Sequence, residues 1–243
     1  MTLLAVEGLS KRFGGVRAVE SLSFQVEAGT LFGIIGPNGA GKTSLFNLMS
    51  GFLKADRGSV RLAGAELVGR PAHAVARAGL ARTFQLVRPF VGLRTLEVLM
   101  LPLGAPGRGL HARECRRRAL AQLEALGLGA HAQAPAESLN QGELRLLDIG
   151  RALAQEPAVL LLDEPFSGLG LPAIRQLIRC LQDRRANGGT TVIIEHRLRE
   201  LMPLMDRVLV MNFGERLAEG TPAQIAHDER VIEAYLGRPG GAA

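Results

Sequence analysis

Short apolar segments alternate with polar and helix-like segments along the chain, and their spacing predicts strands separated by helices. Strand-like alternation fills most of residues 1–36, in the segments LLAVEGL (3–9), SLSFQVE (21–27) and TLFGIIG (30–36). Continuous apolar runs return later, at VLLLD (159–163), TTVIIE (190–195) and RVLVM (207–211). Strands that alternate with helices are typical of an α/β fold, in which a largely parallel sheet is covered on both faces.

The segment after the third strand mixes helical and strand-like patterns. TSLFNLMSG (43–51) predicts a helix that is closed by Gly51, because glycine commonly ends helices. SVRLAG (59–64) predicts a short hairpin-like piece, and GLARTF (79–84) predicts a strand that follows a helix beginning near Pro71. These elements continue the alternation that the first strands begin.

The pattern changes at residue 86. From 86 to 155 the sequence predicts helices and loops, with a Pro/Gly-rich break at LPLGAPGRG (101–109). We therefore expect a helical insertion between strands of the sheet. The expected organisation is one domain, 1–243, made of a core (1–85 and 156–220), a helical subdomain (86–155) and a C-terminal helical segment (221–243).

A glycine-rich turn joins the strand at 30–36 to the next helix. Its sequence, GPNGAGKT (36–43), fits the phosphate-loop pattern of glycine, four residues and Gly-Lys-Thr. Glycines let backbone N–H groups close around phosphates, and the helix directs its positive N-terminal end at them. Lys42 is expected to reach the β- and γ-phosphates of a nucleotide, and the Thr43 hydroxyl to bind Mg²⁺. The nucleotide-binding residues predicted here are Gly36, Pro37, Asn38, Gly39, Ala40, Gly41, Lys42, Thr43 and Ser44. A strand before the motif and a helix after it disfavour the alternative, a glycine turn without a ligand.

Two adjacent carboxylates, Asp163 and Glu164, follow the apolar run VLLL. This places them at the carboxyl end of a buried strand, where ligand sites gather in open α/β sheets. Nucleotide hydrolysis needs one carboxylate for the metal and can use a second to deprotonate the attacking water. We assign Asp163 to Mg²⁺ and Glu164 to the general base. The alternative is an acidic strand end that caps the next helix.

Composition places the chain among soluble globular proteins, with 47% hydrophobic and 21% charged residues. Apolar stretches such as AVLLL (158–162) are far shorter than the roughly 20 residues that a bilayer-spanning helix needs. The N-terminal MTLLAVEGLSKRF does not have the layout of a signal peptide, so a cytoplasmic protein is expected.

The net charge of +6 leaves several partners open. The densest basic cluster, HARECRRR (111–118), lacks the interleaved aromatic residues of a nucleic-acid platform, which makes nucleic acid the weakest candidate. A solvated helix face is favoured, with anionic lipid head groups as the alternative. Cys115 and Cys180 have no metal-ligand spacing. Cys115 falls on a stripe with helical spacing, formed by Ala112, Cys115, Ala119, Leu123 and Leu126, and is expected to be a buried thiol.

Over essentially its whole length, the chain resembles an ATP-binding cassette (ABC) ATPase. The sequence landmarks of that family occur in order: Phe13 in KRFGG, the phosphate loop, Gln85 in RTFQ, LNQGE (139–143), VLLLDEP (159–165) and His196 after TVIIE. The resemblance implies a phosphate-loop NTPase (RecA-like) core of mostly parallel sheet, with an antiparallel β subdomain and the inserted helical subdomain. ATP and Mg²⁺ are the implied cofactors.

The resemblance also implies roles for single residues. Phe13 matches the aromatic residue that stacks on adenine, and Gln85 the glutamine that contacts Mg²⁺ and signals to membrane subunits. His196 matches the switch histidine that contacts the γ-phosphate. The implied catalytic residues are Glu164, His196 and Lys42, and the implied Mg²⁺ ligands are Thr43, Gln85 and Asp163. The signature motif, which acts on ATP held by a partner subunit, corresponds to Leu139, Asn140, Gln141, Gly142 and Glu143.

Softer signals resemble the high-affinity importers of branched-chain amino acids and of amides such as urea. They are ARTFQLVRPF (81–90), VIIEH (192–196), LAEGTP (217–222) and VIEAYLG (231–237). This resemblance implies a peripheral subunit on the cytoplasmic face of the inner membrane, two transmembrane permease subunits, and indirectly a periplasmic or extracellular substrate-binding protein. A soluble ABC ATPase of iron–sulfur assembly and a lipopolysaccharide-export ATPase remain alternatives. A DNA-repair ABC protein is disfavoured, because the chain has no room for its long insertions.

The chain departs from the family pattern in motifs that serve the partner's site. LNQGE replaces the usual Leu-Ser-Gly-Gly-Gln, and Glu143 places an acidic group near bound phosphate, which is electrostatically unfavourable. Ser167-Gly168-Leu169-Gly170 ends without the expected acidic or amide residue. The chain's own catalytic set is complete. We therefore expect a heterodimer with a second, paralogous ABC ATPase subunit and two unequal ATP sites.

Overall fold

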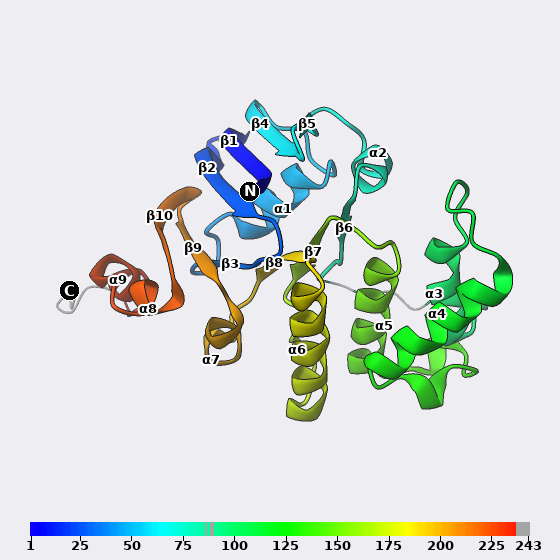
Figure 1. The fold of residues 1–243 in the computed structure, drawn as a ribbon. Coiled ribbons are helices and arrows are strands. Elements are labelled where there is room, and N and C mark those ends of the chain that lie inside the picture. The colour runs from blue at the N-terminus through cyan, green and yellow to red at the C-terminus, as the bar shows by residue number, and fades with distance from the viewer. Residues whose placement is uncertain (86, 88–89, 237–243) are drawn as a thin grey trace.

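Two sheets and the helices around them make up the fold (Figure 1). The computed structural model describes residues 1–85, 87 and 90–236. The larger sheet has the order β10-β9-β3-β8-β7-β6, and its neighbouring strands are parallel except for β10 against β9. Its strands are β3 (Leu31–Ile35), β6 (Leu80–Arg82), β7 (Val159–Asp163), β8 (Thr190–Ile194), β9 (Arg207–Asn212) and β10 (Glu215–Gly220). The α/β class with a mostly parallel sheet is confirmed.

The smaller sheet is antiparallel, in the order β2-β1-β4-β5. Its strands are β1 (Thr2–Phe13), β2 (Val16–Glu27), β4 (Arg57–Leu62) and β5 (Ala65–Glu66). Each strand predicted from apolar spacing is present, but β1 and β2 extend beyond the predicted segments because they pair along their whole length as a hairpin. The sequence did not predict β10, an edge strand with the mostly polar sequence ERLAEG.

The alternation of side chains along the parallel strands divides the interior into two cores. In β7, Val159 and Leu161 join the core that includes the antiparallel sheet and α1 (Lys42–Met49), whereas Leu160 and Leu162 join the core on the other face. A strand buried on both faces must be apolar at every position, as VLLL is. Asp163 is the first polar residue after that run, so it lies at the carboxyl end of the strand.

Helices occupy both faces and both ends of the larger sheet (Figure 1). α5 (Gln141–Leu153) and α6 (Leu171–Ala186) lie on the face opposite α1, while α3 (Thr95–Leu103) and α4 (Ala112–Ala125) form an end of the molecule beyond α5. The remaining α-helices of the described residues are α2 (Ala72–Arg77), α7 (Leu198–Leu201), α8 (Pro222–Ala226) and α9 (Glu229–Leu236), and short 3₁₀ helices lie at Gly129–His131, Ala136–Ser138 and Met202–Leu204. Within the residues described, no helix is both long and apolar enough to cross a bilayer.

The predicted break at 101–109 begins too early, since α3 continues through Pro102 to Leu103. Proline disrupts the interior of a helix, but Pro102 lies in the last turn, and Leu103 is buried in the core that α3 shares with α4. Burial of that leucine offsets the proline, and the helix ends at Gly104.

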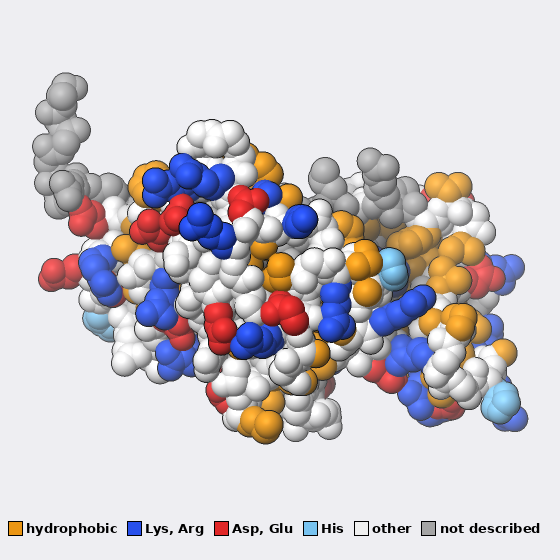
Figure 2. Space-filling view, turned by 90° about the horizontal axis from the view of Figure 1, so that it is seen from above, with side chains coloured by type: hydrophobic (Ala, Val, Ile, Leu, Met, Phe, Trp, Pro, Cys, Tyr) orange, Lys and Arg blue, Asp and Glu red, His pale blue; other side chains and the backbone are white. Residues whose placement is uncertain are grey.

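α4 carries the basic cluster on its outer face. Arg113, Arg116 and Arg117 are exposed, while Cys115 is buried as predicted. Glu114 accepts hydrogen bonds from Arg117 and Arg118 of the same helix, in keeping with a solvated face. Ala112, at the helix start, is exposed and does not belong to the buried stripe. Seen from above, hydrophobic side chains gather toward the end where α3 and α4 lie, and charges of both signs intersperse over the rest of this face (Figure 2).

Candidate functional site

Two glycines of the phosphate loop are fixed by close packing. A Cβ on Gly36 would lie 2.1 Å from the Met211 carbonyl oxygen, and a Cβ on Gly41 would lie 2.1 Å from the Ala18 carbonyl oxygen. Both residues also have positive φ, 151° and 97°, which L side chains rarely adopt. The loop is therefore pressed between β9 and β2, and glycine is required at these positions for the fold.

Lys42 begins α1 and is 6% exposed. Its ammonium group donates hydrogen bonds to the carbonyl oxygens of Gly36, at 2.7 Å, and Pro37, at 2.9 Å. Burial lowers the pKa of Lys42, and the nearby Glu164 and Asp163 carboxylates oppose that shift. Gly41, which cannot cap a helix with a side chain, precedes α1, so the first backbone N–H groups are left for a ligand such as phosphate. Thr43 is exposed in this first turn.

Asp163 ends β7 and is 1% exposed. Its Oδ2 accepts a hydrogen bond from Arg82 at 3.1 Å, whereas Oδ1 is buried without a hydrogen-bond partner among the described residues. Burial raises the pKa of Asp163, and the Arg82 guanidinium opposes that shift. Buried polar atoms normally have partners, so the unpaired Oδ1 fits a ligand such as Mg²⁺ or its bound water. Asp163, Thr43 and Gln85 offer the oxygen donors that this metal prefers.

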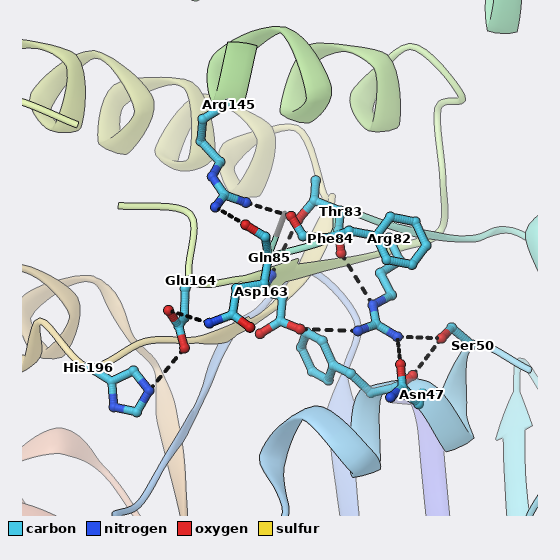
Figure 3. Close-up of polar contacts among 11 residues, drawn as sticks. Asn47, Ser50, Arg82, Thr83, Phe84, Gln85, Arg145, Asp163, Glu164 and His196 are labelled. Carbon is cyan, nitrogen blue, oxygen red and sulfur yellow. Dashed lines mark hydrogen bonds and ion pairs between the residues drawn. The ribbon is translucent and has the colours of Figure 1, made fainter. Parts of the chain in front are cut away.

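Glu164 connects two residues from other elements (Figure 3). Its Oε2 accepts a hydrogen bond from the Gln85 side-chain amide at 3.2 Å, and its Oε1 lies 3.1 Å from His196 Nε2. Gln85 follows β6 and His196 follows β8, the strands on either side of β7. The structure therefore brings Gln85, Glu164 and His196 together at the carboxyl end of the sheet.

Three further residues position this group, and the sequence reasoning missed all of them. Glu195 is 3% exposed and accepts hydrogen bonds from the backbone N–H groups of Phe166, at 2.6 Å, and His196, at 2.9 Å. Arg145 of α5 is 6% exposed and donates to the carbonyl oxygens of Phe84, at 2.5 Å, and Gln85. Arg82 is the third. For Arg82 and Glu195, the signal in the sequence was a charged residue beside apolar strand residues, because such a residue needs a buried partner. Arg145 lies between the acidic residues Glu143 and Asp148, so the sequence carried no such signal for it.

The signature residues lie in a separate place, at the start of α5. Asn140 Oδ1 accepts a hydrogen bond from the Glu143 backbone N–H at 3.0 Å, and Glu143 Oε2 accepts one from the Asn140 backbone N–H at 2.9 Å. This reciprocal pair is a capping box. The other oxygen of Glu143 lies 3.3 Å from His131 Nε2. The Glu143 carboxylate therefore has partners within its own subunit, which sequence reasoning had not foreseen.

A groove of about 450 Å³, which we call the signature groove, joins the start of α5 to the turn before α6. Asn140, Gly142, Gly168, Leu169 and Pro172 are among its lining residues. Gly142 is packed closely here, since a Cβ on it would lie 3.3 Å from the Gly168 carbonyl oxygen. The departures noted in the sequence thus meet on one surface.

Phe13 lies where β1 turns into β2 and is 49% exposed, with the Lys11 ammonium 5.7 Å from its ring centre. No contact recorded for the described part of the chain joins Phe13 or the signature residues to Asp163 or Glu164. Leu86, Arg88 and Pro89 of ARTFQLVRPF, Gly237 of VIEAYLG and the rest of the expected segment to 243 lie outside the described residues.

The C-terminal helix α9 borders the phosphate loop. A groove of about 560 Å³ separates them, lined by Asn38 and Gly39 on one side and Arg230 and Ala234 on the other. Tyr235 is 38% exposed, but burial of its hydroxyl end raises its pKa to about 12, against an opposing hydrogen bond from the Gly36 backbone. The residue thus ties α9 to the first glycine of the loop.

Family models and relatives match this chain. A family model described as ABC transporter matches residues 19–167, and one described as branched-chain amino acid ATP-binding cassette transporter matches residues 215–240. The high-affinity branched-chain amino acid transport ATP-binding protein LivG of Escherichia coli is 38% identical, over 97% of this chain and 98% of its own length. The corresponding BraF protein of Pseudomonas aeruginosa is 37% identical over the same shares.

Solved structures give the same result. A nucleotide-free ATP-binding cassette from an ABC transporter superposes with a TM-score of 0.86 at 30% identity, covering 98% of this chain and 100% of that one. The ADP conformation of an ATP-binding cassette of an ABC transporter superposes with a TM-score of 0.85 at 31% identity and the same coverage.

Proposed function

We propose a function from the premise that this chain belongs to the ABC transporter family of ATPases. The chain is the ATP-binding and ATP-hydrolysing subunit of an importer, and it couples hydrolysis to the uptake of branched-chain amino acids or a related small polar solute. The observation that carries the substrate class is the C-terminal match at 215–240, together with relatives that are similar over nearly the whole chain.

The residues at the carboxyl ends of the parallel strands carry out ATP hydrolysis. The phosphate loop from Gly36 to Ser44 cradles the phosphates, and Lys42 exchanges its loop carbonyl partners for phosphate oxygens. Glu164 holds and deprotonates the attacking water, with its carboxylate set between Gln85 and His196. His196 then contacts the γ-phosphate. Thr43, Gln85 and Asp163 would hold Mg²⁺, which neutralises charge that develops on the phosphate oxygens.

Coupling requires partners on the chain's surfaces. We propose that a second ABC ATPase subunit, a paralogue, docks so that the signature groove faces its ATP and two ATPs lie between the subunits. Phe13 stacks on the adenine of this chain's own ATP. Gln85 and the helical subdomain, proposed for 86–155, pass dimer closure to two permease subunits. The chain is then peripheral on the cytoplasmic face of the membrane, and a substrate-binding protein acts on the other side.

The test is reconstitution of the chain with its permeases and second ATPase in proteoliposomes that enclose ATP. We expect uptake of labelled leucine, isoleucine or valine, driven by a loaded binding protein and lost with Glu164→Gln. A panel that includes urea narrows the solute class. Lipid extraction without amino-acid uptake would instead indicate a lipopolysaccharide-export ATPase. Full ATPase activity of a native protein that does not sediment with membranes would indicate a soluble ABC ATPase of cytosolic iron–sulfur assembly.

A further inference from the structure

Arg82, the last residue of β6, occupies a buried position that the hydrolytic mechanism above does not use. Its side chain is 5% exposed. Three aromatic rings surround its guanidinium, with ring centres at 5.7 Å for Phe46, 6.0 Å for Phe52 and 5.0 Å for Phe84. These rings confine the plane of the guanidinium and shield it from water.

The hydrogen bonds of Arg82 join three elements (Figure 3). Nη2 donates to Asp163 Oδ2 on β7 at 3.1 Å, while Nη1 donates to Asn47 Oδ1 at 2.6 Å and, at the end of α1, to Ser50 Oγ at 3.1 Å. Nε donates to the Thr83 carbonyl oxygen at 3.2 Å, next to the segment that carries Gln85. Only the planar fork of arginine can make bonds in these directions at once, and a lysine ammonium cannot.

Stability alone does not account for this arrangement. Transfer of a guanidinium and a carboxylate from water into the interior is expensive, and replacement of a buried ion pair by apolar residues is often neutral or stabilising. The ion pair instead determines an orientation. When one oxygen of a carboxylate is held by a hydrogen bond, the direction of its second oxygen is fixed as well. In Figure 3, Asp163 Oδ1 points away from Arg82, to the side on which Gln85 and Glu164 lie.

We propose that Arg82 is the positioning residue for the metal-binding carboxylate. By occupying Oδ2 it fixes the rotamer of Asp163, so that Oδ1 is presented to Mg²⁺ in the nucleotide complex. By bonding Asn47 and Ser50 it also fixes β7 relative to α1, the helix that carries Lys42 and Thr43. The inference rests on the proposed function, since it assumes that Asp163 serves the metal.

The experiment measures nucleotide affinity with and without metal. Binding of a non-hydrolysable ATP analogue to the purified chain is titrated in Mg²⁺ and in EDTA, and the ratio of the two dissociation constants gives the gain due to Mg²⁺. Residues that orient metal ligands typically contribute about 10–100-fold to metal affinity. We therefore expect Arg82→Met and Arg82→Lys each to reduce the Mg²⁺ gain by about tenfold or more, with affinity in EDTA within about twofold of wild type.

Asp163→Asn sets the floor for this ratio. If Arg82 acts through Asp163, the double variant Arg82→Met/Asp163→Asn has the same Mg²⁺ gain as Asp163→Asn alone. The matched control is Arg184→Met, which removes a partly buried arginine that bonds the Pro157 carbonyl oxygen away from the site, and it should keep the wild-type gain. Thermal melting of every variant checks the fold.

Three results would overturn the proposal: an unchanged Mg²⁺ gain in Arg82→Met or Arg82→Lys, equal losses of affinity with and without metal, or additive effects in the double variant. If Arg82→Met does not fold, Arg82→Lys decides, since it keeps the buried positive charge and changes only the fork. A wild-type chain without any Mg²⁺ gain would contradict the proposed function itself. A wild-type gain that the Arg82 variants retain would contradict only the role of Arg82.

Discussion

The phosphate-loop site and the signature groove differ in how their polar groups are satisfied. At the first, Glu164 is bonded to residues that follow two neighbouring strands, and Asp163 to an arginine that also reaches α1. At the second, Asn140 and Glu143 bond mainly to each other's backbone within one turn of α5. The first arrangement exists only when distant parts of the chain have folded together, whereas the second is local.

This difference indicates where each region obtains its geometry. The site on the sheet is organised by the chain itself before any ligand binds. At the signature residues, the backbone N–H groups at the start of α5 are hydrogen-bonded within the helix itself. The rest of this region is an open groove, so its geometry in a complex depends on the partner that docks there. From the sequence alone, the acidic Glu143 was expected to be unfavourable beside a bound phosphate. In the structure its carboxylate is held by the Asn140 backbone N–H and by His131.

The largest expected effect separates the two regions directly. Glu164→Gln should lower ATP turnover of the assembled complex by about 10²–10⁴-fold, because it removes the general base. Glu143→Gln, the matched change in the signature, should change turnover only a few-fold, since a glutamine can also complete a capping box. Steady-state phosphate release measures both. Equal losses would contradict this division between the two regions. A dominant effect of the equivalent glutamate in the second ATPase would contradict the proposal that the more active of the two unequal ATP sites is this chain's own.

Replacement of Arg145 tests whether α5, besides lining the signature groove, also holds the segment that carries Gln85. Its replacement by methionine leaves the Phe84 and Gln85 carbonyl oxygens without their charged donor, and should lower the free energy of unfolding by about 2–3 kcal/mol. Arg117→Met on α4 removes an exposed contact to Glu114 and should lower it by less than about 1 kcal/mol. Urea denaturation gives both values. Similar values for the two variants would mean that Arg145 does not tie α5 to the segment of Gln85.

Asn140→Ala tests whether the signature residues are stabilised locally, within α5. Loss of a helix cap lowers stability by about 1 kcal/mol, which thermal or urea unfolding can resolve. The same variant should bind nucleotide, as an isolated subunit, with unchanged affinity. Weaker nucleotide binding by the isolated chain would show that the two regions are not separate.

The smallest effect concerns α9 and the phosphate loop. Tyr235 is the only tyrosine, and the chain has no tryptophan, so ultraviolet absorbance follows this single hydroxyl. Burial raises its pKa to about 12 in the folded chain, above the ordinary value of 10. The unfolded chain therefore loses the proton first, and the contribution to stability is lost as pH rises from about 10 to about 12. A titration midpoint that is the same in native and denatured protein would contradict the burial of the Tyr235 hydroxyl.

Much of this molecule could be predicted from the spacing of its apolar residues. VLLL predicted a strand buried on both faces, and it places Asp163 and Glu164 at the carboxyl edge of the sheet. Periodicity could not predict β10, because an edge strand pairs on only one side and tolerates the polar sequence ERLAEG.

The contacts that support the site were less predictable. Arg82, Arg145 and Glu195 act through partners that lie 29 to 81 residues away in sequence. A charged residue in an apolar segment indicates that a partner exists but not which one. The roles of Phe13 and of the signature residues stay predictions, because they concern ligands and partners rather than contacts within the chain.

Glu164 has one further consequence, which concerns selection for stability. Its φ of 48° lies in the left-handed region, which costs a residue with a Cβ roughly 1–2 kcal/mol. Glycine adopts this conformation freely, so Glu164→Gly should yield a folded protein that resists heat better but has also lost its general base, and with it about 10²–10⁴-fold in ATP turnover. A screen of random variants for thermal resistance alone would therefore enrich inactive chains at this position, and directed evolution of this ATPase needs transport or turnover as a second criterion.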